Sequence, residues 1–149
     1  MSDLAIRPME AADQAVWRSL WLGYQTFYRV DLPEEATATL WARMADPAEP
    51  VHGALAWRNG AAVGLAQWLT HRSTWSVADV CYLNDLFVAP DCRGGGVGRR
   101  LIAHVEAAAR AAGCARVYWL THESNATARA LYDKVAARTG FIHYGMALP

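Results

Sequence analysis

The stretch 82–102 joins a strand-like run, a cluster of glycines and the start of a helix. Residues 83–88 are largely apolar and extended in character, and Pro90 ends the run because proline cannot donate to a β-ladder. Four glycines follow within residues 94–98. Apolar residues then recur at helical spacing from Leu101, and Gly113 stands where such a helix would end. The sequence therefore predicts a strand, a glycine turn and a helix in direct succession.

The glycine turn has the composition of an anion-binding loop. Glycine lacks a Cβ, so the backbone can turn tightly and approach a ligand, and the N–H groups at a helix start form a cradle for an anion. Arg93, Arg99 and Arg100 add positive charge. These residues predict a pyrophosphate site, and the alternative is a flexible turn with no ligand. The turn is not a P-loop, because no Lys-Ser or Lys-Thr follows the glycines, and it is not a dinucleotide-binding fingerprint.

Composition limits the class of protein. With 149 residues, 54% of them hydrophobic, the chain is expected to form one domain over residues 1–149. Its 14 basic and 14 acidic residues balance, which argues against a nucleic-acid-binding protein. No membrane-length run or secretion signal is visible, so we expect a cytoplasmic protein with no membrane partner. The three cysteines and the histidines have no metal-ligand spacing, so no metal is predicted.

The remaining elements are predicted from periodicity and turn signals. Strands are expected at 4–7, 51–57, 61–70, 77–88, 116–121 and 141–148, with a hairpin at Asn59-Gly60. Helices are expected from a cap at Asp13 to Tyr28, over 33–44, over about 97–112, and from Ser124 or Asn125 to about Arg138. This order predicts an α/β fold with a mixed, mostly antiparallel sheet and helices on both faces.

The glycine turn resembles the Arg/Gln-x-x-Gly-x-Gly/Ala signature of the GNAT superfamily of N-acetyltransferases, with Arg93, Gly96 and Gly98 at its fixed positions. Residues 125–132 are similar to the superfamily's Asn-x-x-Ala-x-x-Leu/Phe-Tyr pattern, and Gly140-Phe141 follows as in the superfamily. The resemblance is close over residues 82–141 and extends to the element order. It is nearest to the branch that acts on histone or polyamine amines, although polyamine enzymes carry Glu-Asp where this chain has Asn84-Asp85.

The resemblance implies an enzyme that transfers the acetyl group of acetyl-CoA to a primary amine by direct attack in a ternary complex. Acetyl-CoA would lie where the strand ending at Val88 parts from the strand at 116–121. Its pantetheine arm would pair with the first strand, its pyrophosphate would sit on the glycine turn, and two further residues would contact its far side. The implied cofactor-binding residues are Leu86, Phe87, Val88, Arg93, Gly94, Gly95, Gly96, Val97, Gly98, Arg99, Asn125 and Lys134.

The chemistry requires three groups. The acceptor ammonium must lose a proton, the thioester oxygen must be stabilised, here by the Val88 N–H, and the departing thiolate must be protonated. By resemblance Tyr132 is the acid for the last step. Asp85 is the candidate base or amine-binding group, with Glu123, His71 or a chain of water molecules as alternatives. Because successive strand residues face opposite sides, at most one of Asn84 and Asp85 is expected to face the acceptor.

The acceptor is expected to be a polyamine, another small-molecule amine or a protein lysine. Acidic and aromatic residues could line its entrance or have purely structural roles: Glu34, Glu35, Tyr24, Tyr28, Trp41, Trp68 and Trp75. The apolar strand predicted at 141–148 suggests a homodimer. Two alternatives stay open, a CoA-binding module without catalysis and a phosphate-binding protein that uses only the glycine turn. A titration of CoA against ATP distinguishes the last of these from an acetyltransferase.

Overall fold

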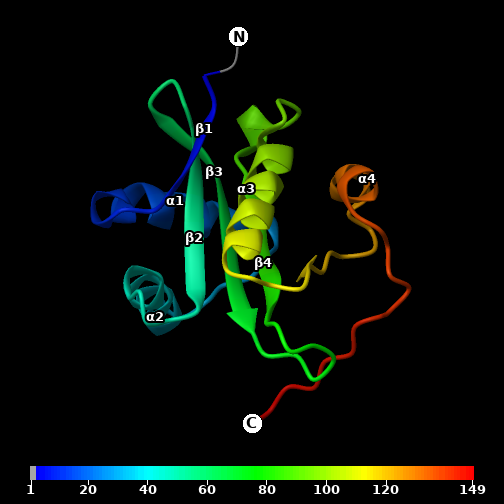
Figure 1. Ribbon diagram of the computed structural model, residues 1–149. Helices are drawn as coiled ribbons and strands as arrows, with labels where there is room; N and C mark the ends of the chain where they lie inside the picture. Colours follow the sequence, from blue (N-terminus) through cyan, green and yellow to red (C-terminus); the bar gives the residue numbers. More distant parts are fainter. Residues whose placement is uncertain (1–2) are drawn as a thin grey trace. The chain divides into compact units, whose positions relative to one another are not determined.

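The computed structural model describes residues 3–149 and divides into two compact units, Met1–Tyr118 and Trp119–Pro149. The first unit holds all five strands and three of the α-helices (Figure 1). Its elements are β1 (Ala5–Pro8), the 3₁₀ turn η1 (Ala11–Asp13), α1 (Gln14–Phe27), α2 (Glu34–Ala45), β2 (Val51–Arg58), β3 (Ala61–His71), β4 (Val80–Val88), the 3₁₀ turn η2 (Pro90–Cys92), α3 (Val97–Ala111) and β5 (Val117–Tyr118).

The five strands form one sheet in sequence order, β1-β2-β3-β4-β5. The pairs β1–β2, β2–β3 and β3–β4 are antiparallel, and the pair β4–β5 is parallel. The hairpin between β2 and β3 turns at Asn59 and Gly60, whose φ angles of 52° and 77° are those of the turn type that Asn-Gly favours. The prediction of a mixed, mostly antiparallel sheet is therefore confirmed.

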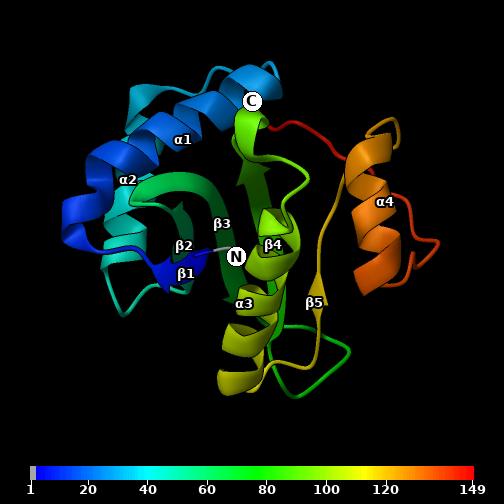
Figure 2. The same cartoon turned by 90° about the horizontal axis from the view of Figure 1, so that it is seen from above.

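Helices cover both faces of this sheet (Figure 2). On one face Leu55, Leu65 and Phe87 form a core cluster with Trp17, Leu20 and Trp21 of α1, and Leu40 and Met44 of α2 pack against it. Gly64 precedes Leu65 and therefore faces the other side. There a side chain at Gly64 would lie 3.2 Å from both Val97 and Leu101 of α3. In Figure 1 α3 accordingly lies in front of the sheet, and α1 passes behind it.

The close approach of α3 to β3 depends on Gly64. A Cβ there would lie 2.8 Å from the Phe87 carbonyl oxygen, which is backbone and cannot rotate away. We expect Gly64→Ala to lower the free energy of unfolding by about 1–3 kcal/mol, measured by chemical denaturation. Gly23→Ala in α1 is the matched control. Its Cβ would lie 3.4 Å from the Phe87 ring, which is an ordinary van der Waals contact. It should be neutral or stabilise by up to about 1 kcal/mol, and an equal loss in both variants would contradict this account.

One predicted helix cap and two predicted strand ranges in the first unit differ from the structure. Asp13 stands at the start of α1 but makes no side-chain cap to it. Its carboxylate instead accepts a hydrogen bond from the Glu10 N–H at 2.8 Å and one from Arg7 at 3.0 Å, because the chain enters α1 through η1. The predicted strand at 77–88 begins only at Val80, and that at 116–121 is limited to Val117–Tyr118.

The second unit contains α4 (Ala126–Val135), which follows Asn125 and ends before the predicted Arg138. The prediction of a final strand at 141–148 is wrong, because residues 137–149 adopt no regular structure. Phe141, Tyr144 and Met146 are 80%, 85% and 86% exposed. Alternating apolar residues favour a strand only where a second strand supplies ladder hydrogen bonds, and the second unit contains no other strand. Across residues 3–149, every helix falls short of the length and apolar character that a membrane crossing requires.

Candidate active site

One edge of β4 is open for most of its length. β3 pairs with β4 from Val80 to Val88, whereas β5 pairs only with Cys81 and Tyr82. Within the described residues no strand pairs with 83–88 on that second edge. The Ala89 N–H donates to Val63 of β3 at 2.8 Å. Because successive N–H groups of a strand point to opposite edges, the Val88 N–H is directed to the open edge.

A bulge in β4 sits beside this open edge. Gln67 pairs with Asp85 and Trp68 pairs with Leu83, so Asn84 has no partner in the β3 register. An extra residue of this kind interrupts the regular alternation of side chains. Tyr82 and Asp85, three positions apart, therefore lie on the same face, opposite Leu69 and Gln67 of β3.

The glycine turn has the geometry of an anion cradle. Gly94 and Gly96 have φ angles of +84° and +81°, which favour glycine, and Gly96 is the residue before α3. No side chain caps this helix. The first intrahelical bond runs from the Arg100 N–H to the Gly96 carbonyl at 3.1 Å. The N–H groups of Val97, Gly98 and Arg99 are therefore available to an anion.

The arginines of the turn are not equivalent. Arg93 Nε donates to the Val88 carbonyl at 3.1 Å, and its guanidinium lies 4.3 Å from the centre of the Phe27 ring. Arg100 donates to the Leu4 carbonyl at 3.3 Å. Arg99 is exposed on the first turn of α3 and makes no side-chain hydrogen bond or ion pair within residues 3–149. Arg99 is thus the cation left to meet an anion at the turn, and Arg93 holds the end of β4.

Asp85 is the acidic centre of the sheet's α1 face. Trp17 Nε1 donates to Gln67 Oε1 at 2.7 Å, and Gln67 Nε2 donates to Asp85 Oδ2 at 2.9 Å. Because an indole can only donate, Trp17 fixes the orientation of the Gln67 amide and makes Gln67 a donor to Asp85. The Tyr24 hydroxyl is a second hydrogen-bond partner of Asp85.

The environment of Asp85 changes its protonation. Burial raises the pKa of Asp85 above its ordinary value, and the hydrogen bonds from Tyr24 and Gln67 offset only part of this effect. Burial, followed by the Asp85 charge, raises the pKa of Tyr24. Tyr24 is therefore a donor to Asp85, and Asp85 binds a proton more readily than a carboxylate in water does.

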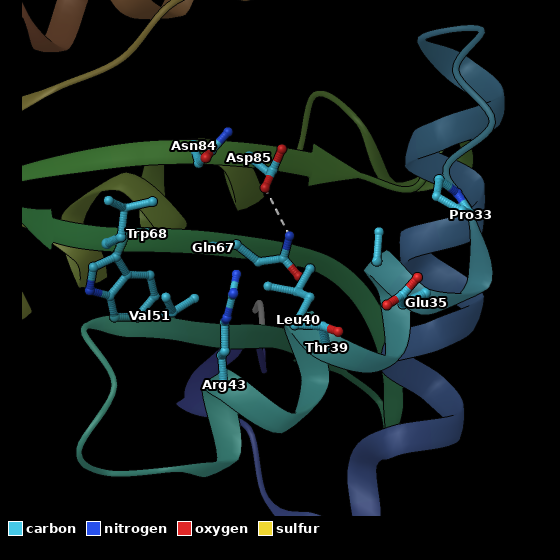
Figure 3. Close-up of a pocket in the computed structure, with 12 residues that line it drawn as sticks. Pro33, Glu35, Thr39, Leu40, Arg43, Val51, Gln67, Trp68, Asn84 and Asp85 are labelled. Carbon is cyan, nitrogen blue, oxygen red and sulfur yellow. Dashed lines mark hydrogen bonds between the residues drawn. The ribbon is translucent and has the colours of Figure 1, made fainter. Parts of the chain in front are cut away.

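Asp85 opens onto a pocket of about 460 Å³ between α2 and the sheet (Figure 3). Glu35, Arg43 and Leu40 of α2 line it, together with Trp68 of β3. Asn84 lines it as well, so the expectation that at most one of Asn84 and Asp85 faces the acceptor side is wrong, because the bulge interrupts the alternation. Arg43 points toward Gln67 in Figure 3, and its guanidinium has no hydrogen-bond or ion-pair partner among the described residues. The pocket thus carries two carboxylates, Asp85 and Glu35, and an unpaired cation.

The other predicted site residues lie in the second unit. Asn125 precedes α4, and its carbonyl accepts the Arg129 N–H at 3.0 Å. Tyr132 lies two turns along α4, half-buried, with its ring 5.4 Å from that of Trp119. Lys134 is exposed in the last turn.

Sequence reasoning missed three residues of the first unit. Gln67 and Arg43 contribute to the pocket, and Tyr118 accompanies Tyr82 on the same face of the sheet. The β3 alternation could have placed Gln67 on the face of Leu65, but nothing in the sequence set the register that brings it to Asp85. His71 lies one residue beyond the strand predicted at 61–70 and is the last residue of β3. No group of three or more His, Cys, Asp or Glu side chains within 3–149 could hold a metal ion.

Comparison with known proteins adds independent findings. The acetyltransferase (GNAT) family model matches residues 15–137. The chain is 39% identical over 143 residues to the D-amino-acid N-acetyltransferase HPA3 of Saccharomyces cerevisiae, covering 95% of this chain and 89% of the yeast protein. It is 33% identical over 148 residues to the N-acetyltransferase YhfO of Bacillus subtilis, covering 97% of each. The aminoglycoside N-acetyltransferase AAC(6′)-Iy in complex with CoA has the same fold, with a TM-score of 0.84, 21% identity and coverage of 99% of this chain and 96% of that one.

Proposed function

This chain belongs to the acetyltransferase (GNAT) family, and from that premise we propose that its acceptor is a free amino acid, acetylated on its α-amine. The chain is an acyltransferase that uses acetyl-CoA as co-substrate and transfers the acetyl group to an amine. The observation that carries the proposal is that the Asp85 carboxylate and the partnerless Arg43 guanidinium line the same pocket. An α-amino acid carries the complementary pair of charges, an ammonium and a carboxylate.

The charges of the pocket distinguish this acceptor from the others considered. Polyamines and lysine side chains have no carboxylate beside the amine, so they would leave Arg43 unpaired. A free amino acid can place its ammonium at Asp85 and its carboxylate at Arg43, where a guanidinium binds both oxygens of a carboxylate. The name of the yeast relative, at 39% identity, supports the D-enantiomer as the preferred one. This acceptor departs from the histone or polyamine branch that the sequence resembles most.

For acetyl-CoA we propose the subsites implied by the family. The open edge of β4 at Leu86, Phe87 and Val88 would pair with the pantetheine arm as an added strand. The N–H groups at the start of α3 and the Arg99 guanidinium would bind the pyrophosphate. Asn125 and Lys134 would contact the cofactor's far side. The family match spans both units, 15–137, which supports one domain over 1–149.

The chemistry then follows from groups of known type. Asp85 accepts a proton from the acceptor ammonium, and its raised pKa favours this transfer. The free amine attacks the thioester carbon while the Val88 N–H stabilises the oxygen as it gains charge. The CoA thiolate departs and takes a proton from the Tyr132 phenol, and the phenolate regains a proton as the acylated nitrogen loses its second one. A dimer through residues 141–148 stays a prediction that follows from the apolar character of this segment.

The test is Arg43→Met, assayed with D-alanine and with D-alaninamide, which lacks the carboxylate. A charge-assisted hydrogen bond contributes about 1.5–3 kcal/mol, so kcat/KM for D-alanine should fall roughly 10- to 100-fold, mainly through KM. The value for the amide should change far less. Arg110→Met is the matched control, because Arg110 pairs with Glu106 on α3, away from the pocket.

Two results would contradict the proposed acceptor. One is an equal loss for the acid and the amide, which would mean that Arg43 does not bind the carboxylate. The other is a wild-type preference for spermidine or lysine peptides over every free amino acid. Release of CoA that needs no amine at all would instead contradict the transfer reaction.

A further inference from the structure

Four polar side chains, those of Asp85, Tyr82, Tyr118 and His71, lie in a row on the α1 face of the sheet. Gln67, Leu69 and His71 alternate along β3 and share this face, and their neighbours in the register are Asp85, Tyr82 and Val80. Tyr82 is paired in turn with Tyr118 of β5, so Tyr118 shares the face too. The row therefore runs from Asp85 through Tyr82 and Tyr118 to His71, and the bulge at Asn84 is what brings Asp85 into it.

Two contacts join Tyr82, Tyr118 and His71, and Asp85 lies next to Tyr82 on the same face without touching it. The rings of Tyr82 and Tyr118 stack with centres 4.8 Å apart and planes 18° apart. The Tyr118 hydroxyl lies 2.7 Å from His71 Nε2. Burial raises the pKa of Tyr82, and the neighbouring Tyr118 and Asp85 raise it further, as expected for groups that interact along one row. The Arg116 guanidinium lies 5.0 Å from the centre of the Tyr118 ring, on the far side of the row from Asp85.

The hydrogen bonds of His71 fix its tautomer. Nδ1 lies 2.7 Å from the Arg72 carbonyl, which can only accept, so Nδ1 carries a proton. In the neutral ring Nε2 then has a lone pair and accepts the hydrogen bond of the Tyr118 hydroxyl. His71 is half-buried at the end of β3, whereas Asp85 is held among Gln67 and Tyr24. The row thus joins the acid at the pocket to a proton acceptor at the end of β3.

We propose that Asp85, Tyr82, Tyr118 and His71 form a proton relay that carries the acceptor's ammonium proton from the pocket to solvent. The inference rests on the proposed function in one respect, that an amine is deprotonated at Asp85. Asp85 is the group that touches the acceptor, and the other three act through it. The relay explains why a histidine outside the pocket is aligned with the acidic centre through two stacked tyrosines.

The protons balance in three steps. The acceptor ammonium gives one proton to the Asp85 carboxylate and becomes a neutral amine. Asp85 passes a proton to the Tyr82 hydroxyl through a bridging water molecule, and that hydroxyl gives one toward Tyr118 through a second water molecule. Tyr118 gives its hydroxyl proton to His71 Nε2 and regains one from the side of Tyr82. The imidazolium so formed loses a proton to water, which is the one proton that the overall acetylation of an ammonium releases.

The experiment compares Tyr118→Phe and His71→Gln with the wild type on acceptors of different amine basicity. Tyr118→Phe keeps the ring stacked on Tyr82 and removes only the hydroxyl. For a strongly basic amine, kcat should fall roughly 100-fold, the lower end of the range for general base catalysis. For a weakly basic amine of similar shape, the loss should shrink to a few-fold, because less proton removal is needed before attack. Added imidazole should restore part of the activity of His71→Ala.

Controls separate the relay from a structural role. Tyr28→Phe removes the hydroxyl of a tyrosine that contacts Tyr24 outside the row. Any change in kcat relative to the wild type should be the same for strongly and weakly basic amines. CoA affinity and the unfolding temperature of each variant report on folding. An equal loss for strongly and weakly basic amines, or no loss at all, would overturn the relay, as would an absence of imidazole rescue. None of these results depends on which amine is the natural acceptor. The relay can therefore be contradicted while the proposed acceptor holds, and the proposed acceptor can be contradicted while the relay holds.

Discussion

Replacing Asp85 with asparagine is expected to lower kcat/KM for an amino-acid acceptor by roughly 10²- to 10⁴-fold, the range in which a positioned acid or base contributes. The carboxylate is the acidic group hydrogen-bonded to both Gln67 and Tyr24 at the pocket. Asparagine keeps the size of the side chain but cannot accept a proton from an ammonium. Steady-state kinetics at saturating acetyl-CoA measure the effect.

Asp13→Asn is the matched control for this substitution. Asp13 is a buried carboxylate, 6% exposed, and it bonds to Arg7 and Glu10 rather than lining the pocket. Its substitution should lower the free energy of unfolding. At a temperature where the variant is folded, kcat should stay within about twofold of the wild type, because a substitution away from the pocket affects activity only through folding. Equal activity losses at the two positions would contradict a chemical role for Asp85.

Asp85→Asn should lower activity but raise the free energy of unfolding relative to the wild type as pH increases. The folded-state pKa of Asp85 is raised, first by burial, above the value near 3.9 of an unfolded chain. A group with a raised folded pKa stabilises the fold below the unfolded pKa, and this contribution is lost as pH rises through the folded pKa. The asparagine variant lacks that loss. Its free energy of unfolding relative to wild type should therefore rise with pH from about pH 4 and then level off; a relative stability that falls over this range would contradict the pKa assignment.

Local sequence signals were sufficient for the elements that depend on local chemistry. Asn59-Gly60 specified its hairpin, and the φ angles of Gly94 and Gly96 explain why glycine is needed in the turn before α3. The apolar periodicity from Leu101 specified α3 because one stripe packs on the sheet. These features depend on residues close together in the chain, and such interactions can be derived without knowing the fold.

The features that sequence reasoning missed depend on pairing between distant residues. The bulge at Asn84 exists only relative to β3, and without it the alternation rule puts Asp85 on the wrong face relative to Tyr82. The segment 141–148 has the apolar alternation of a strand but no partner within its unit, so it stays irregular and exposed. Arg43 was indistinguishable from any other exposed helix arginine until α2 was placed over Gln67 and Asp85. A site assembled from several strands thus needs the register as well as the residues.

The second large effect is expected at the glycine turn. Gly96 has φ +81° and no atom within 4 Å of where a Cβ would stand. A valine there would strain the backbone, because a β-branched residue is a strong outlier at positive φ. It would also project a side chain into the space that the proposed pyrophosphate occupies. We expect Gly96→Val to weaken CoA binding on the order of 100-fold, measured by calorimetry, which corresponds to about 2.7 kcal/mol.

Gly113→Val separates strain from ligand contact. Gly113 follows the other end of α3, has φ +78° and has nothing within 4 Å of its Cβ position. Both substitutions should lower the free energy of unfolding to a similar extent, because both force valine into the same backbone region. Only the change at Gly96 places a side chain beside the N–H groups that face the proposed anion, so only that variant should lose CoA affinity. Comparable losses of CoA affinity in the two variants would mean that the turn acts through helix stability. Binding of ATP as tight as that of CoA would mean that the turn binds phosphates without selecting the coenzyme.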